Sequence, residues 1–128
     1  MSNNYGYIYL ISFDNTNSIY IGKTTRDISK RFYEHLHSFK SVREYMLVNG
    51  INNDNVHIDI IDRLNMDEIV YNDKFNIVSK NYRLDLLERF HIDYFEKSRY
   101  SLINIQKCSF NITDYDMFIL KKGYTKYV

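Results

Sequence analysis

The chain has 128 residues, 45% of them hydrophobic and 26% charged, with a formal net charge of +1. These values predict one folded domain and exclude a disordered chain, and the longest apolar runs fall short of the roughly 20 residues of a membrane-spanning helix. The single cysteine, Cys108, excludes an internal disulfide and a cysteine-based zinc or iron–sulfur site. We therefore expect an intracellular, reducing setting, the cytoplasm or nucleus, and no membrane partner. The many residues with AT-rich codons suggest a virus or mobile element as the source.

The start of the chain predicts a β-hairpin. Residues 5–13 alternate aromatic and aliphatic side chains, a turn-forming cluster follows at 14–17, and residues 18–22 form a second short strand. Pairing Phe13 with Ser18 places one set of side chains on a single face, namely Tyr7, Tyr9, Ile11, Tyr20 and Gly22. We expect open space at Gly22 beside the Tyr9 ring, where a ligand backbone or phosphate could come close. Ordinary aromatic core packing is the alternative.

Helices and one further strand follow. Asp27 is a plausible N-cap for a helix over 28–39, and Ser41 with Glu44 resembles a capping box for a second helix that ends at Gly50. Alternation over 56–62 predicts a third strand. A short helix at 67–71, a polar irregular loop at 72–81, an amphipathic helix at 83–97, extended pieces at 102–105 and 110–113, and a terminal helix at 114–122 complete the prediction. This β-β-α-α-β-α order predicts an α+β fold with a small antiparallel sheet flanked by helices.

The hairpin carries two short motifs with a family resemblance. Tyr7-Ile8-Tyr9 is followed, eleven residues after Tyr9, by Tyr20-Ile21-Gly22. The pair resembles the name motifs of the GIY-YIG nuclease family, which lie on two adjacent strands. The second motif is intact. In the first, Tyr7 stands where the family usually has Gly, and Gly6 lies one place earlier.

Later residues extend the resemblance to about Ile105. Arg31 and His35 lie four residues apart on the predicted first helix, and therefore share one face. Glu88 lies in a Leu-rich helix, and Asn104 begins a short extended segment, as in the family. The resemblance implies a three-stranded antiparallel sheet flanked by helices. It predicts a single domain over 1–128, with a catalytic core at 5–105 and a C-terminal extension at 106–128.

The resemblance implies a metal-dependent endonuclease that hydrolyses DNA, one strand per active site. Glu88 would hold one divalent cation, Mg²⁺ or Mn²⁺, and Arg31 would contact the phosphate. Tyr9 or Tyr20 would help to activate the water. The family favours Tyr20 as the proton acceptor, with Tyr9 positioning the water, but the residues alone leave this choice open.

Further candidates have supporting roles. His35 could accept or relay a proton, and Asn104 could orient Glu88 or a backbone segment. Basic residues near the second motif are candidates for contacts with nucleic acid, namely Lys23, Arg26 and Lys30. Other polar residues have mainly structural interpretations: His57 and Asp59 as an exposed strand face, His91 as a helix-packing residue, and Cys108 as an inert thiol.

Two other functions stay open at this point. The altered first motif allows a catalytically inactive GIY-YIG-fold module that binds nucleic acid or protein. A tyrosine-rich hairpin could also serve a small interaction domain. Five motif residues retained together favour an active enzyme: Tyr9, Tyr20, Gly22, Arg31 and Glu88. We expect duplex or branched DNA as the partner, and a homodimer or a separate DNA-targeting partner, because little chain follows Ile105.

Overall fold

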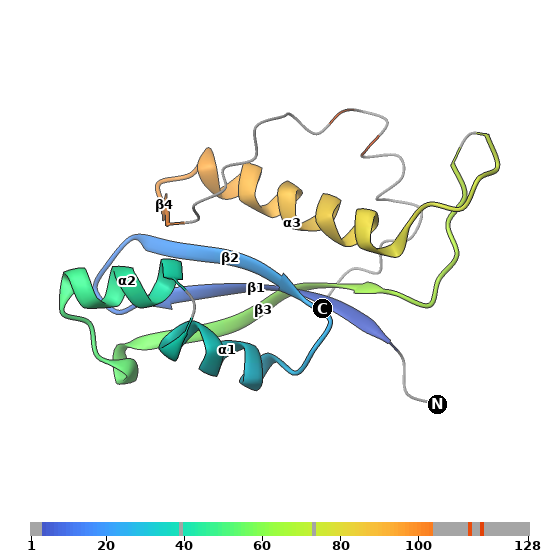
Figure 1. Cartoon of the computed structure of the whole chain (residues 1–128). Helices are drawn as coiled ribbons and strands as arrows, with labels where there is room; N and C mark the ends of the chain where they lie inside the picture. Colours follow the sequence, from blue (N-terminus) through green and yellow to red (C-terminus); the bar gives the residue numbers. More distant parts are fainter. Residues whose placement is uncertain (1–3, 39, 73, 104–112, 114–115, 117–128) are drawn as a thin grey trace.

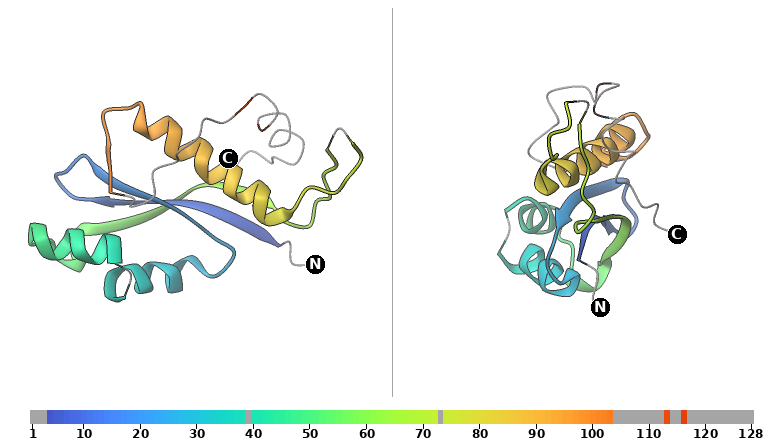
Figure 2. Two further views of the ribbon diagram at one scale, coloured as in Figure 1. Left: turned by 45° about the horizontal axis from the view of Figure 1, so that its top comes forward. Right: turned by 90° about the vertical axis from the view of Figure 1, so that its right-hand side faces the viewer.

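The computed structural model describes residues 4–38, 40–72, 74–103, 113 and 116. A four-stranded sheet, in the order β3-β1-β2-β4, lies between two helical layers (Figures 1 and 2). Its strands are β1 (Tyr5–Phe13), β2 (Ser18–Thr24), β3 (Val56–Asn65) and β4 (Ser101–Leu102). The helices are α1 (Ile28–His37), α2 (Lys40–Asn49) and α3 (Lys80–Glu96), with a short 3-10 helix, η1 (Asn53–Asn55), before β3. The α+β class and the β-β-α-α-β-α order are confirmed.

The fourth strand corrects the prediction of a three-stranded sheet. β4 pairs in parallel with the start of β2, through Ser18 with Ser101 and Ile19 with Leu102. A two-residue strand shows no alternation, so the sequence predicted extended chain here but not its pairing. Within the described part of the chain, the edge of β2 beyond Ile19 has no neighbouring strand.

The hairpin has the predicted register. Tyr9 lies opposite Gly22, and Ile11 lies opposite Tyr20. A bulge in the pairing with β3 follows Ile8, but β1 itself keeps its alternation. Tyr9 and Ile11 therefore point to the α1 and α2 face, whereas Ile8 points to α3.

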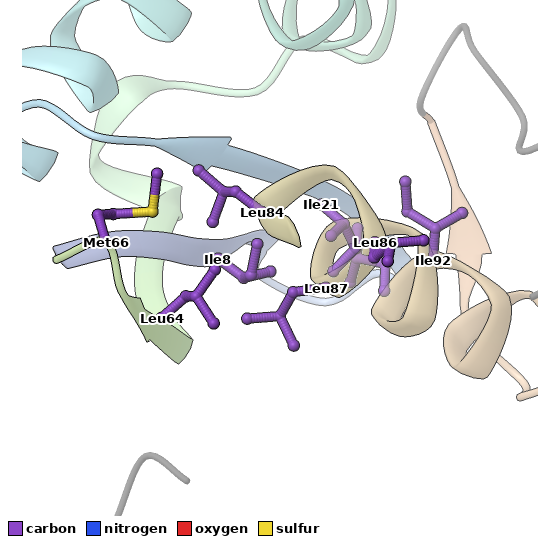
Figure 3. Packing of buried hydrophobic residues seen from close by; sticks show 9 residues of the cluster. Ile8, Ile21, Leu64, Met66, Leu84, Leu86, Leu87 and Ile92 are labelled. Atoms are coloured by element: carbon purple, nitrogen blue, oxygen red, sulfur yellow. The ribbon is translucent and has the colours of Figure 1, made fainter. Parts of the chain in front are cut away.

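Each face of the sheet has its own core. The α3 core contains Ile8, Ile19, Ile21, Leu64, Met66, Leu84, Leu86, Leu87 and Ile92 (Figure 3). The core on the other face contains Tyr9, Ile11, Phe13, Leu36, Val42, Met46 and Val56. Thus the tyrosine-bearing face of β1 is covered by α1 and α2, while α3 packs on the opposite face against β2, β4 and β1.

Gly6 allows α3 to approach β1 closely. A methyl group at Gly6 would lie 2.8 Å from Leu84 Cδ1 and 3.1 Å from the Met66 sulfur. Gly6 therefore serves the α3 core and does not replace the glycine that the first motif lacks.

Of the two predicted helix caps, the one at Asp27 is confirmed and the one at Ser41 is wrong. The Asp27 carboxylate caps α1 by accepting hydrogen bonds from the Ser29 and Lys30 amides, at 2.7 and 3.4 Å. The capping box at Ser41 is wrong, because α2 begins at Lys40 and Ser41 lies inside the helix. A capping residue must have non-helical backbone angles, which Ser41 does not have in α2.

The predicted helix at 67–71 is also wrong. Val70 is buried, its carbonyl accepts from the Val78 amide at 2.8 Å, and Tyr71 forms a β-bridge with Ile77. Buried Arg83 donates to the Glu68 carbonyl at 2.7 Å. These tertiary bonds hold the segment in an extended conformation that its local sequence does not indicate.

Several predictions fall outside the described residues. These are the segments at 104–105 and 110–112 and most of the helix at 114–122, together with Asn104 and Cys108. The division into a core at 5–105 and an extension at 106–128 stays a prediction. Among the described helices, none is long and apolar enough to cross a membrane.

Candidate active site

Three side chains meet at the hydroxyl group of Tyr9. The Tyr9 Oη and His35 Nε2 atoms are 2.6 Å apart, and Arg31 Nε donates to the same hydroxyl at 3.2 Å. Burial first, and then the Arg31 charge, lower the pKa of His35 to about 4, so the imidazole is neutral at pH 7. We assign the Tyr9 proton to His35 Nε2, because the hydroxyl oxygen already accepts from Arg31.

Local sequence explains this cluster. The Asp27 cap fixes the start of α1, and the four-residue spacing then places Arg31 and His35 on the helix face toward Tyr9. Across the hairpin, Gly22 provides the room for the phenol ring. A methyl group at Gly22 would overlap the Tyr9 ring and hydroxyl. The open space expected at Gly22 is therefore wrong, because the Tyr9 ring itself fills it.

The two tyrosines have different environments. Tyr9 is 0% exposed, and burial is the main cause that raises its pKa to about 12. The Tyr20 ring lies 6.4 Å from the Tyr9 ring and 4.8 Å from His35, centroid to centroid, and Tyr20 is half-buried. No described residue hydrogen-bonds the Tyr20 hydroxyl, whereas the Tyr9 hydroxyl is bonded twice. Burial raises the Tyr20 pKa, the Glu88 charge raises it further, and Arg31 opposes both.

Glu88 reaches this region from α3. Its charge raises the pKa of both Tyr9 and Tyr20, although α3 packs on the other face of the sheet. Burial raises the pKa of Glu88 itself, and the cations of Lys23, Arg89 and Arg31 oppose that shift.

Glu88 has the chemistry of a single-carboxylate metal ligand. None of the described residues forms a hydrogen bond or ion pair with it, and those residues contain no group of three His, Cys, Asp or Glu that could enclose a metal. Mg²⁺ prefers oxygen ligands, keeps several waters and is often held by one or two carboxylates. A half-buried carboxylate with a raised pKa fits such a cation.

The basic candidates lie on two sides of the site. Lys23 points to the α3 face and forms an ion pair with Asp85, one turn before Glu88. Asp85 was missed by sequence reasoning; its spacing of three residues from Glu88 was the available signal. Arg26 pairs with Glu34 at 2.6 Å, and Lys30 is exposed in the first turn of α1.

The other polar candidates lie in separate contacts. His57 pairs with Asp14 at 2.9 Å, and Asp59 is exposed, which agrees with the expected polar strand face. His91 is bonded to buried Asp62 at 2.7 Å. This contact ties α3 to β3 and agrees with the helix-packing interpretation of His91.

Comparison with known proteins finds one matching family model. Residues 5–61 match the family model of the GIY-YIG catalytic domain. The matched region runs from β1 into β3 and contains Tyr9, Tyr20, Gly22, Arg31 and His35; it ends before Glu88. No curated protein and no solved structure matches the chain.

The fold and the hairpin motifs thus define a nuclease-type domain. The match to the GIY-YIG catalytic domain over residues 5–61 agrees with the resemblance that the sequence motifs predicted. A GIY-YIG catalytic domain implies nuclease-type function with DNA as the substrate class, and GIY-YIG nucleases generally depend on a divalent metal.

Proposed function

We propose that the chain is a metal-dependent endonuclease that hydrolyses DNA phosphodiester bonds, one strand per active site. The observation that carries this proposal is the convergence of Tyr9, Arg31 and His35 beside Tyr20, within electrostatic reach of Glu88. Cleavage of both strands of a duplex then needs two protomers or two successive events.

Arg31 has the role of holding the scissile phosphate. A guanidinium group carries five N–H donors in a rigid fork, and the Nε donor is anchored on the Tyr9 hydroxyl. The anchored side chain loses less entropy when it binds an anion, and it presents its charge in a fixed direction. Lys23, Arg26 and Lys30 are proposed contacts for more distant parts of the DNA backbone.

Tyr20 is the proposed proton acceptor. The Tyr9 hydroxyl is buried and bonded to Arg31 and His35, and its pKa of about 12 disfavours loss of its proton. His35 is neutral, but its Nε2 atom is occupied by Tyr9. Tyr20 remains, and neutralising the Glu88 charge removes one of the two causes that raise its pKa. Tyr9 is then a positioning residue that orients Arg31.

Glu88 is the proposed metal ligand. When bound there, Mg²⁺ or Mn²⁺ supplies charge neutralisation at the phosphate and stabilises the leaving 3′ oxygen. The residues of this chain supply the rest: Arg31 binds the phosphate, and Tyr9 with His35 keeps the guanidinium in place. Tyr20 first loses its phenolic proton to solvent, and the resulting phenolate takes the proton of the attacking water.

Nicking of supercoiled plasmid in Mg²⁺ or Mn²⁺ tests the proposal. We expect the wild type to nick, and Glu88→Gln and Tyr20→Phe to lose at least about 100-fold in rate. Glu96→Gln and Tyr94→Phe change exposed residues of the same helix, α3, and should cut like the wild type. Equal nicking by all five proteins would reveal a contaminating nuclease. A fully inactive wild type, on branched as well as plain DNA, would favour the binding-module alternative.

A further inference from the structure

A hollow lies near the cluster of Tyr9, Arg31 and His35, called the catalytic cluster below, and has no role in the chemistry above. It has a volume of about 360 Å³ and lies between the N-terminal half of β1, β3 and the start of α1. Its walls are Asn4, Tyr5 and Tyr7, the connection at 25–28, and Ile60. Tyr7 is the residue that departs from the family pattern, and here it supplies an aromatic wall that a glycine would lack.

The walls form an aromatic and guanidinium surface. The rings of Tyr5 and Tyr7 lie 6.3 Å apart at an interplanar angle of 42°, and both tyrosines are half-buried. Arg63, which pairs with Tyr7 across the sheet, places its guanidinium carbon 4.5 Å from the centre of the Tyr5 ring. Such surfaces bind nucleobases by stacking, because every base presents a π-face to an aromatic ring or a guanidinium plane.

The hollow shares its elements with the catalytic cluster. Tyr7 precedes Tyr9 by two residues on the same face of β1, a separation of about 7 Å along the strand. Ile28 lines the hollow, and Arg31 lies one turn further along α1. A nucleotide in the hollow is therefore close to a phosphate held by Arg31.

The charges at this corner suit a polynucleotide strand. Arg26 lines the hollow, Arg63 lies over the Tyr5 ring, and Lys30 is exposed in the first turn of α1. Three nearby carboxylates are already engaged: Asp27 accepts from backbone amides in the first turn of α1, Glu34 accepts from Arg26, and Asp67 accepts from the Asn4 amide. Uncharged aromatic walls with a basic rim match a neutral base attached to an anionic backbone.

We propose that this hollow binds one unpaired nucleobase of the DNA strand that is being cut. The proposal rests on the proposed nuclease function and specifies its substrate. A base inside a duplex is stacked and paired, so it enters only after extrusion, which costs energy. The subsite therefore favours flaps, branches and single-stranded segments over plain duplex.

A binding experiment without cleavage tests the subsite. The probe is a short oligodeoxynucleotide with the fluorescent base 2-aminopurine at one position, either single-stranded or paired, titrated with protein in EDTA. We expect quenching at one position of the single strand. Tyr7→Gly should weaken single-strand binding roughly 5- to 100-fold and duplex binding much less, whereas Tyr7→Phe keeps the ring and should bind within about twofold of the wild type.

The matched control is Tyr94→Ala, which removes a 63% exposed tyrosine on α3 and should bind like the wild type. If Tyr7→Gly does not fold, as judged by thermal unfolding, Tyr7→Leu removes the ring but keeps an apolar strand residue and takes its place. Absence of quenching at every position, or an equal loss on duplex and single strand, would refute the subsite. The second result would indicate a general contact with the backbone.

Cleavage separates this proposal from the proposed function. With Mg²⁺, the ratio of flap to duplex cleavage rates should fall in Tyr7→Gly, relative to the wild type and Tyr7→Phe. An unchanged ratio in an active enzyme refutes the subsite and leaves the nuclease intact. Quenching by a wild type that cuts no DNA overturns the nuclease function and retains a nucleobase site.

Discussion

Removal of the Tyr9 hydroxyl group is the sharpest test of the site geometry. In Tyr9→Phe the ring still fills the space over Gly22, but His35 Nε2 and Arg31 Nε lose the oxygen that lies 2.6 and 3.2 Å from them. A neutral hydrogen bond contributes about 1 kcal/mol, and one to a charged group about 1.5–3 kcal/mol. Arg31 is half-buried and water replaces part of its loss, so we expect a destabilisation of about 2–3 kcal/mol.

Urea unfolding at pH 7, followed by fluorescence or circular dichroism, measures this change. The matched control is Tyr33→Phe, which removes a hydroxyl from a 63% exposed tyrosine on α1 and should change stability by less than about 0.5 kcal/mol. Nicking should fall with Tyr9→Phe as well, because the Arg31 guanidinium loses its anchor.

A destabilisation below about 0.5 kcal/mol for Tyr9→Phe would refute the reasoning. It would mean that the hydroxyl is not bonded to both partners, and the neutral state assigned to His35 would lose its support. A destabilisation of the expected about 2–3 kcal/mol with unchanged nicking would instead show that the Tyr9 hydroxyl has only a structural role and that the function of Arg31 does not depend on it.

Three further predictions follow from the same contacts. Gly22→Ala should destabilise the protein by roughly 1–3 kcal/mol in urea unfolding, because its methyl group overlaps the Tyr9 ring; wild-type stability would contradict the described packing. Glu88→Gln should equal or exceed the wild type in stability at pH 7 while losing activity. The pKa of Glu88 is raised in the folded protein, so its contribution to the free energy of unfolding is lost as the pH rises from its unfolded pKa through its folded pKa. A variant less stable than the wild type at pH 7 would contradict this direction of the pKa shift. His35 has a folded pKa lowered to about 4, so it contributes stability above its unfolded pKa of about 6.5 that is lost as pH falls toward 4. Measured at pH 7, 5.5 and 4, the free energy of unfolding should fall by about 3 kcal/mol between pH 7 and pH 4 because of His35. The His35→Gln variant should show a smaller dependence of this free energy on pH.

Much of the site could be predicted because its contacts are short-range or periodic. The turn at 14–17 fixes the hairpin register, which alone places Tyr9 opposite Gly22. Helical spacing places Arg31 and His35 on one face, and the Asp27 cap sets where that helix begins. These inferences need no knowledge of the rest of the fold.

The failures concern tertiary contacts between distant segments. No local signal shows that the Tyr9 ring fills the space over Gly22, that Arg83 holds the Glu68 carbonyl, or that β4 joins the sheet. The ion pair between Lys23 and Asp85 likewise depends on how α3 docks. Each of these outcomes depends on how segments distant in the sequence pack together, and single-sequence propensity carries no information about that packing.

The placement of Glu88 on the opposite helical layer has a consequence for the assembly of the proposed enzyme. The hairpin and α1 bring Tyr9, Tyr20 and Arg31 together within the first third of the chain, but α3 must dock before the carboxylate joins them. A nascent chain that ends within β3 therefore holds phosphate-binding groups without the metal ligand. The proposed mechanism therefore predicts that a partly synthesised copy does not cut DNA, because the proposed metal ligand joins the site only when α3 has docked on the sheet.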